Sequence, residues 1–269
     1  MLQDLRPSIQ SKQRYHGFSG GMSQANYSVI LLLAFISGIT TLIGVILAIH
    51  TARKPKSIAF GMGFSTGIML LIALVELLPA AMTSSGSVQA MLGFVVGAGV
   101  LALLHWLIPH THLFKETGQF NIRMVRSAYL VALGLILHDF PEGFAMANSF
   151  LTSPSLGLLV ALAIALHNIP EEYAIAAPMA SLDKKTTLYQ IAFVSSLAEP
   201  LGAALGLYAA YLNATLIPLF LSFAAGAMVF VSLHELVPMA RRYGYAQWFL
   251  SGVVISLLVH IGLNRLVPE

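Results

Sequence analysis

Two apolar stretches of the chain carry the same polar interruption. Residues 127–149 read SAYLVALGLILHDFPEGFAMANS, and residues 156–179 read LGLLVALAIALHNIPEEYAIAAPM. The pentapeptides HDFPE (138–142) and HNIPE (167–171) begin 29 residues apart. Each stretch has about the 20 residues that an α-helix needs to cross a bilayer. Two membrane helices with matching polar centres are therefore the feature from which the fold can be predicted.

Each pentapeptide places a histidine and a glutamate four positions apart, on one face of a helix. His138 with Glu142, and His167 with Glu171, thus form two pairs of metal-ligand side chains in apolar sequence. Ionisable groups at membrane depth are costly and indicate a functional site. The prolines remove amide donors and free carbonyls one turn earlier, which is tolerated where helices line a cavity. Small residues, Gly143 among them, predict that the two helices approach each other closely.

Composition places the whole chain among polytopic membrane proteins. Of 269 residues, 57% are hydrophobic and 9% are charged, and the mean hydropathy is +0.81. We expect an all-α fold in which residues 28–266 form one transmembrane domain after a poorly ordered extracytoplasmic tail, residues 1–27. The eight predicted spans are 28–49, 57–79, 88–108, 127–149, 156–179, 187–211, 215–238 and 246–266.

Lysine and arginine occupy alternate connections between the spans. They occur in segments 50–56, 109–126, 180–186 and 239–245, and are absent near 80–87, 150–155 and 212–214. The positive-inside rule makes the four basic segments cytoplasmic, so eight spans put both termini on the extracytoplasmic side. The net charge of +3 is dispersed over these short segments, so we expect the bilayer and not nucleic acid as the macromolecular partner.

Seven of the eleven acidic residues fall inside the predicted spans, where no lysine or arginine lies in a span interior to neutralise them. They are Glu76, Asp139, Glu142, Glu171, Glu172, Glu199 and Glu235. An acid at a helix centre costs a few kcal/mol, so this set implies protonation, bound cations or both.

Counting residues from the span ends gives the depth of each polar group. His138, His167, Glu199 and Met69 all lie about 11 or 12 residues into their spans, roughly 17 Å from the membrane surface and near its midplane. Glu76 lies near the outer end of its span, whereas His234 and Glu235 lie near the inner end of theirs. The pattern predicts an outer mouth, a central site and an inner exit.

Imidazole and carboxylate ligands in a chain without cysteine favour Zn²⁺, Fe²⁺, Mn²⁺, Co²⁺ or Cd²⁺ over K⁺ or Na⁺. Asp139 and Asn168 lie about 100° around their helices from the histidines and predict the flank of a second site that shares Glu142 and Glu171 with the first. Glu172 leans toward this flank.

Several of these residues have plainer alternative interpretations. Met69 is also typical core packing material, and Glu199 could be a protonated donor beside Ser195. Glu76 and Glu235 could be interfacial helix-end residues. Three further histidines lie near span ends and are interpreted as interfacial, without an assigned role: His50, His105 and His260. His110 and His112 could bind metal in the cytoplasmic connection.

At these motifs the chain resembles the ZIP (Zrt-, Irt-like) family of divalent-metal transporters, in particular its bacterial ZupT-like branch. The resemblance covers nearly all spans, with HDFPEG (138–143) and HNIPE (167–171) as its most specific parts. Supporting matches are AEPLG (198–202), GFSTGIMLLIALVELLP (63–79) and HELVP (234–238).

The resemblance implies uptake of Zn²⁺ and related ions into the cytoplasm across a bacterial inner membrane, with the metal as substrate and no catalytic cofactor. It also implies movement of one helix group against another, and frequently a homodimer. The family's first site maps to His138, Glu142, His167 and Glu171 with Met69 as a neighbour. Its second site maps to Asp139, Glu142, Asn168, Glu171 and Glu199.

Two positions depart from the family pattern. Asp139 stands where the family usually has asparagine, and Glu172 stands where it usually has glycine. Both changes add oxygen ligands and negative charge, which favours Fe²⁺ or Mn²⁺ alongside Zn²⁺.

A metalloenzyme and a cation channel are the two alternative classes of function. An intramembrane metalloenzyme would carry H-E-x-x-H or Glu-x-x-His, and in this chain each histidine precedes its glutamate. We therefore expect no enzyme activity. A proton or alkali-cation channel that uses the acids alone would retain no transition metal after purification, which distinguishes it from a metal transporter.

Overall fold

The computed structural model describes residues 24–51, 54–107, 122–177, 180 and 185–267, with side chains from residue 27 in the first range and from residue 137 in the third. These residues are helical, without a strand. Within them, seven helical stretches are long and apolar enough to cross a membrane. They are Tyr27–His50, Pro55–Ser85, Ser87–Leu107, Pro154–Ala176, Lys185–Leu212, Ala214–Arg242 and Ala246–Leu266. The chain is thus an all-helical integral membrane protein.

The remaining predicted span, 127–149, lies within α6 (Ile122–Thr152), a helix of 31 residues. The other long helices are α2 (Gln24–His50), α5 (Ser87–Leu107), α7 (Pro154–Ala176) and α12 (Ala246–Leu266). Because α6 is not among the seven stretches named above, the eight-span topology stays a prediction.

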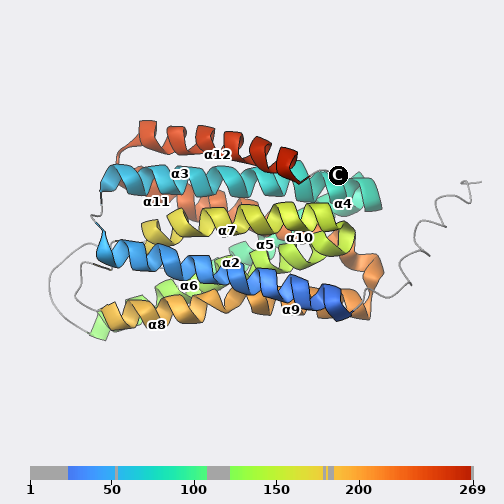
Figure 1. The fold of residues 1–269 in the computed structure, drawn as a ribbon, viewed down its shortest axis with the longest axis horizontal. Helices are drawn as coiled ribbons and strands as arrows, with labels where there is room; N and C mark the ends of the chain where they lie inside the picture. The colour runs from blue at the N-terminus through green and yellow to red at the C-terminus, as the bar shows by residue number, and fades with distance from the viewer. Residues whose placement is uncertain (1–23, 52–53, 108–121, 178–179, 181–184, 268–269) are drawn as a thin grey trace, which may run out of the picture.

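The helices run side by side along the long axis of the molecule (Figure 1). The α2 helix packs along α7, and α5 packs along α10 (Ile217–Val231). The α3 helix (Pro55–Leu71) packs along α12, and α6 packs along α9 (Ala198–Leu212). The start of α2 and the end of α12 lie at the same end of the bundle (Figure 1).

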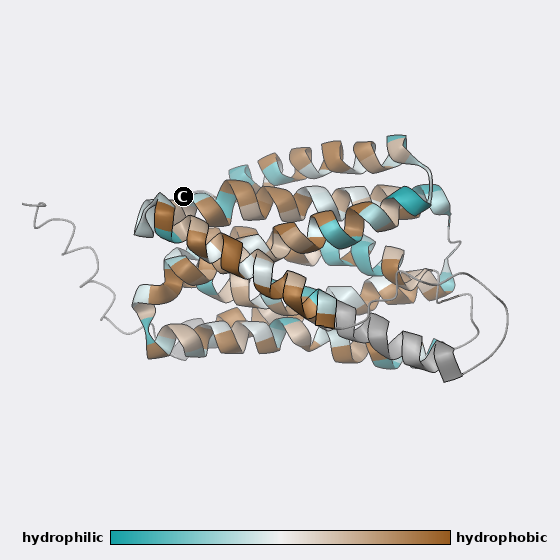
Figure 2. Ribbon diagram, turned by 180° about the vertical axis from the view of Figure 1, so that it is seen from behind, coloured by the Kyte–Doolittle hydropathy of each residue, from teal (hydrophilic) through white to brown (hydrophobic). Residues whose placement is uncertain are grey.

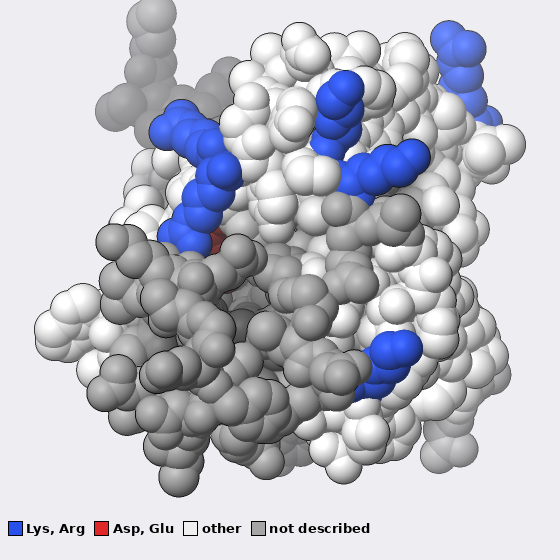
Figure 3. Space-filling model, turned by 90° about the vertical axis from the view of Figure 1, so that its left-hand side faces the viewer, with Lys and Arg blue, Asp and Glu red and all other residues white. Residues whose placement is uncertain are grey.

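Charge divides the bundle into two ends. The exposed basic residues Lys54, Lys56, Lys185, Arg241 and Arg242 come from the connections predicted to be cytoplasmic. Figure 3 shows lysine and arginine spread over one end of the molecule, with hardly any acidic surface beside them. The end of α2 and the start of α3 lie at this end of the bundle (Figure 1).

The outer surface is apolar and the interior contains the polar groups. Leucine, isoleucine and valine side chains of α2, α5 and α12 are exposed along their helices, and Figure 2 shows apolar residues over most of the ribbon with short hydrophilic interruptions. Buried polar side chains instead concentrate in α6 and α7. In a bilayer this inside-out pattern buries the ionisable groups against protein while lipid covers the apolar faces.

Two spans contain a π-turn at an acidic residue. The π-helix η2 (Ile72–Leu77) continues α3 into α4 (Leu78–Ser85), and η5 (Ser232–Leu236) continues α10 into α11 (Val237–Arg242). Both turns carry the sequence E-L-x-P, at 76–79 and 235–238. The proline lacks an amide hydrogen and crowds the carbonyl four residues earlier, and a wider turn accommodates both effects. Because π-turns are frequent at functional sites, Glu76 and Glu235 are candidate functional residues.

The helices extend beyond the apolar stretches that predict them. The α6 helix begins at Ile122, inside the predicted connection 109–126, and α6 and α7 are joined through Ser153 alone. The predicted tail 1–27 overlaps the start of α2, and its residues 1–23 lie outside the described range. Hydropathy marks the hydrocarbon core, whereas backbone hydrogen bonding continues the helix into the interface.

The predicted span 187–211 is interrupted at Leu197, between α8 (Lys185–Ser196) and α9. The cause is Pro200, which has no amide hydrogen for the carbonyl of Ser196 four positions earlier. The amide of Leu197 instead bonds the carbonyl of Val194 at 3.2 Å. The freed carbonyl of Ser196 points at Gly38 of α2, where any side chain would collide with it.

Gly143 was predicted to bring α6 close to α7, but it faces α9 instead. A Cβ at Gly143 would collide with the backbone of Glu199 on α9, and a Cβ at Gly202 would meet the backbone of Phe140 on α6. The two glycines let α6 and α9 approach to backbone contact at the level of the HDFPE segment. As a result, α9 brings Glu199 to the polar centre of the bundle.

Candidate metal site

The α6 and α7 helices hold the two His–Glu pairs. Pro141 and Pro170 lie inside these helices without ending them. The exposed fractions are 4% for His138, 0% for Glu142, 0% for His167 and 3% for Glu171. The four side chains are thus removed from solvent within the bundle.

The shortest contacts between histidine and glutamate join one helix to the other, so the pairing is crossed. The Nε2 atom of His138 contacts Oε1 of Glu171, and Nε2 of His167 lies 3.2 Å from Oε1 of Glu142. Within one helix the separations are longer, 3.9 Å for His138 to Glu142 and 3.8 Å for His167 to Glu171. Ligand atoms of His138, Glu142 and Glu171 all lie within 4.8 Å of one another. The structure therefore brings the four predicted side chains together in one cluster.

Hydrogen bonding fixes how His167 faces this cluster. Its Nδ1 atom donates to the carbonyl of Ala163 at 2.9 Å, because a carbonyl can only accept. In the neutral ring, Nε2 then carries a lone pair that points at a carboxylate oxygen of Glu142. Two lone pairs at 3.2 Å repel, so a proton or a metal ion between these atoms stabilises the arrangement.

Two carboxylate oxygens of the cluster, Glu142 Oε2 and Glu171 Oε2, are buried and accept no hydrogen bond. Buried ionised groups without partners are strongly unfavourable. A divalent cation bound by imidazole nitrogen and carboxylate oxygen would satisfy both glutamates at once.

A second group of polar side chains adjoins the first. The hydroxyl of Ser195 on α8 donates to Oδ2 of Asp139 at 2.5 Å, and the amide of Asn168 donates to Oε1 of Glu199 at 2.5 Å. The backbone of Glu199 lies against Gly143, the residue that follows Glu142 in α6. The predicted flank residues are thus held at this level in hydrogen-bonded pairs, and the hydroxyl of Ser195 donates to Asp139 and not to Glu199.

Glu172 lies on the side of α7 that faces α2. Its Cβ is 2.7 Å from the position of a Cβ built at Gly44, and its exposed fraction is 2%. Its Oε2 atom has no hydrogen-bond partner. The expected lean of Glu172 toward the Asp139 flank stays a prediction.

Met69 is fully buried in the hydrophobic core, and its sulfur accepts a hydrogen bond from Ser232 at 3.5 Å. One turn earlier on α3, the hydroxyl of Ser65 donates to the backbone carbonyl of His167 at 3.0 Å. This contact ties the middle of α3 to the level of the central cluster. A role for Met69 as a ligand stays a prediction.

Two of the histidines assigned no role pair with the acids at the ends of the bundle. His260 of α12 lies 3.0 Å from Glu76 in η2, and His105 of α5 lies 3.1 Å from Glu235 in η5. The ring of His234 stands edge-on to His105 with a centroid separation of 4.6 Å. Both histidines thus have carboxylate partners, and their position at the membrane interface stays a prediction. His110 and His112 lie outside the described residues.

Sequence reasoning missed these two pairs because the partners are far apart in the chain. His105 and Glu235 are separated by 130 residues, and no local periodicity connects them. The repeated E-L-x-P segments were the available signal, since each marks a π-turn that directs an acid toward a neighbouring helix.

Comparison with known proteins agrees with this geometry. The model of the ZIP zinc transporter family matches residues 110–262. The zinc transporter ZupT of Akkermansia muciniphila is 36% identical over 88% of this chain and 97% of its own length. The ZupT proteins of Streptococcus mutans and Escherichia fergusonii are 35% and 38% identical, over 88% and 90% of this chain and 97% and 98% of their own. With its crossed His–Glu pairs on two membrane helices, the chain belongs to the ZIP zinc transporter family.

Proposed function

We propose that this chain carries divalent transition-metal ions, Zn²⁺ foremost, into the cytoplasm across a bacterial inner membrane. The relatives that cover nearly the whole chain are zinc transporters, and no sequence signature of a metalloenzyme is present. Fe²⁺, Mn²⁺, Co²⁺ and Cd²⁺ match the same ligands. Both termini are extracytoplasmic and eight helices cross the membrane, with α6 as the eighth.

The observation that carries the proposal is the crossed pairing of His138 with Glu171 and of His167 with Glu142, at almost no solvent exposure. Each metal would receive ligands from α6 and from α7. A change in the relative position of these helices would alter the ligand set, and protonation of the glutamates would weaken it further. Both processes give a route to release.

We also propose a second metal position on the flank, with Asp139, Glu142, Asn168, Glu171 and Glu199 as ligands. It is supported by the hydrogen bonds that already orient Asp139 and Glu199 beside Glu142. Because Asn168 occupies one oxygen of Glu199, metal binding would exchange that amide donor for the ion or turn the amide to present its oxygen.

Uptake of radioactive zinc into proteoliposomes tests the central site. We expect Glu142→Ala and His167→Ala to remove uptake, and Ser149→Ala to retain it. Ser149 is the matched control because it lies on α6, is fully buried and has no hydrogen-bond partner. Uptake by Glu142→Ala or His167→Ala at the rate of the unmodified protein would overturn the assignment. If the purified protein retains no transition metal and conducts protons, the alternative of a proton channel is favoured.

A further inference from the structure

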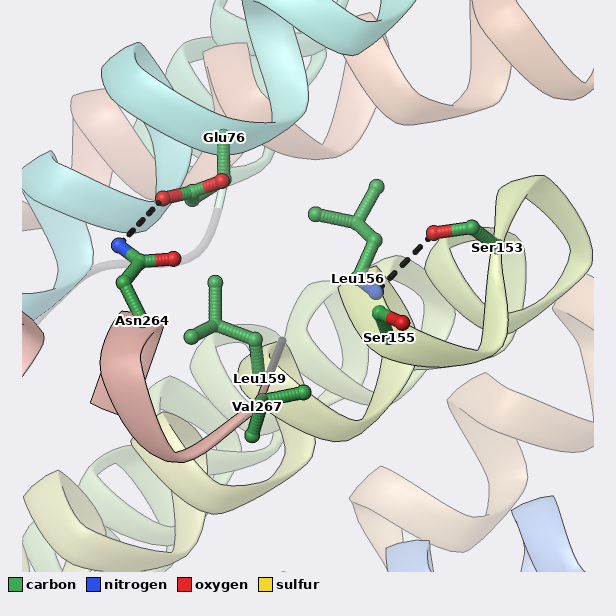
Figure 4. Close-up of a pocket in the computed structure, with 7 residues that line it drawn as sticks. All are labelled: Glu76, Ser153, Ser155, Leu156, Leu159, Asn264 and Val267. Atoms are coloured by element: carbon green, nitrogen blue, oxygen red, sulfur yellow. Dashed lines mark hydrogen bonds between the residues drawn. The ribbon is translucent and has the colours of Figure 1, made fainter. Parts of the chain in front are cut away.

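A pocket opens at the end of the bundle opposite the basic residues. It encloses about 340 Å³ and lies between η2, the end of α12 and the connection of α6 to α7. Figure 4 shows Glu76 and Asn264 pointing toward each other at one side of the pocket, with Ser153 and Ser155 at the other. By the charge pattern of the connections this is the extracytoplasmic end.

Two residues that line the pocket, Glu76 and Asn264, meet the side chain of His260 beside it. The distance from Glu76 Oε1 to His260 Nε2 is 3.0 Å, and the distance from His260 Nε2 to Asn264 Nδ2 is also 3.0 Å. Asn264 Nδ2 lies 3.1 Å from Glu76 Oε1. Asn264 is exposed, the side chain of Glu76 is 18% exposed and that of His260 is 5% exposed. The three atoms form a nearly equilateral triangle that is open to solvent on the side of Asn264.

No assignment of protons turns all three contacts into hydrogen bonds while Glu76 is ionised. If Nε2 of His260 has no proton, it accepts from Asn264 and presents a lone pair to the carboxylate. If Nε2 has a proton, it donates to Glu76 and meets the amide hydrogens of Asn264 head-on. Rotation of the amide, which exchanges its oxygen and nitrogen, places two oxygens 3.1 Å apart without a hydrogen between them.

A cation resolves all three contacts together. With the amide rotated, the triangle presents an imidazole nitrogen, a carboxylate oxygen and an amide oxygen. Ligands about 2.1 Å from an ion are roughly 3.0 Å apart in octahedral geometry and 3.4 Å apart in tetrahedral geometry, so the observed 3.0–3.1 Å spacing suits metal coordination. The pocket has room for water as the remaining ligands. The imidazole favours a transition metal over Ca²⁺ or Mg²⁺.

We propose that Glu76, His260 and Asn264 form a separate metal-loading site at the extracytoplasmic pocket. The ligands come from η2 and α12, so the site shares no residue with the cluster on α6 and α7. Its role in loading rests on the inward transport proposed above, whereas the binding of metal to it does not.

Cysteine labelling tests the binding directly, since the chain contains no cysteine. Asn264→Cys places a single exposed thiol at the triangle, and a membrane-impermeant maleimide added from outside reports its accessibility. At a Cd²⁺ concentration ten times its Kd, we expect labelling to slow about tenfold. This protection disappears when Glu76→Gln or His260→Gln is added to Asn264→Cys. Both glutamine variants retain the size of the side chain and leave the central cluster intact.

Ser87→Cys is the control for the thiol itself, because Ser87 is exposed at the same end and does not line the pocket. Its labelling rate should not respond to Cd²⁺. Cd²⁺ protection of Asn264→Cys that survives both glutamine substitutions, or no protection at all, overturns the loading site. Either result leaves the proposed transport intact, since the loss of uptake in Glu142→Ala is measured separately.

Discussion

Replacing Glu142 with glutamine separates the role of its charge from the role of its shape. The side chain is fully buried, one oxygen faces the lone pair of His167 at 3.2 Å, and the other oxygen has no hydrogen-bond partner. Glutamine keeps the volume and can turn an amide hydrogen toward Nε2 of His167. The metal-free protein should therefore unfold at the same temperature as the unmodified protein or at a higher one.

The metal-bound protein should respond in the opposite direction. Removing one partner of a buried ion pair costs about 3–5 kcal/mol, which corresponds to a roughly 150- to 5,000-fold weaker Kd. At a Zn²⁺ concentration 1,000 times the unmodified Kd, binding stabilises the unmodified protein by about 4 kcal/mol. The same concentration would stabilise Glu142→Gln by only about 0.1–1.2 kcal/mol.

Thermal unfolding in detergent with and without Zn²⁺ measures both effects, and equilibrium dialysis gives the Kd. The control Ser149→Ala should keep the full metal-induced shift. The reasoning is refuted if Glu142→Gln lowers the unfolding temperature of the metal-free protein while its Zn²⁺ affinity stays within threefold of the unmodified value.

Three further predictions concern packing, orientation of a ligand and topology. Gly143→Ala would press a Cβ against the backbone of α9 and should cost about 1–3 kcal/mol of stability by thermal unfolding, whereas Gly99→Ala, which has no atom within 4 Å, should be neutral or stabilising. Ser195→Ala removes the hydroxyl that orients the α6 aspartate and should weaken metal binding about 10- to 100-fold by dialysis; unchanged metal stoichiometry and affinity would remove this aspartate from the ligand set. An impermeant maleimide should label Ser87→Cys from outside intact cells and Lys185→Cys only in inside-out vesicles, and the reverse pattern would invert the topology.

The sequence predicts the central cluster well because its information is local. A four-residue spacing inside a helix brings His138 and Glu142 to one face whatever the rest of the chain does. Matching depth in two antiparallel spans then brings the α7 pair to the same level. The structure agrees with both steps, since His138 contacts Glu171 and His167 lies beside Glu142.

The contacts that sequence reasoning missed are set by tertiary packing. His260 reaches Glu76 because α12 packs along α3, and Ser195 reaches Asp139 because α8 packs against α6. Proline marks these positions in the sequence, but a proline predicts a disturbed turn without saying which neighbour the freed group will face. The partner helix of Gly143 was missed for the same reason.

The absence of lysine and arginine from the interiors of the predicted spans has a consequence for the membrane potential. The electrical free energy of one elementary charge changes by about 2.3 kcal/mol per 100 mV when it crosses the whole membrane. For a bare dication the change is about 4.6 kcal/mol per 100 mV. If the carboxylates stay in place while the ion passes, an inside-negative voltage should drive uptake with that full sensitivity. If α6 and α7 carry their glutamates along with the ion, the moving charges cancel and the sensitivity to voltage falls. Uptake measured against an imposed voltage therefore reports whether the ligands travel with the metal.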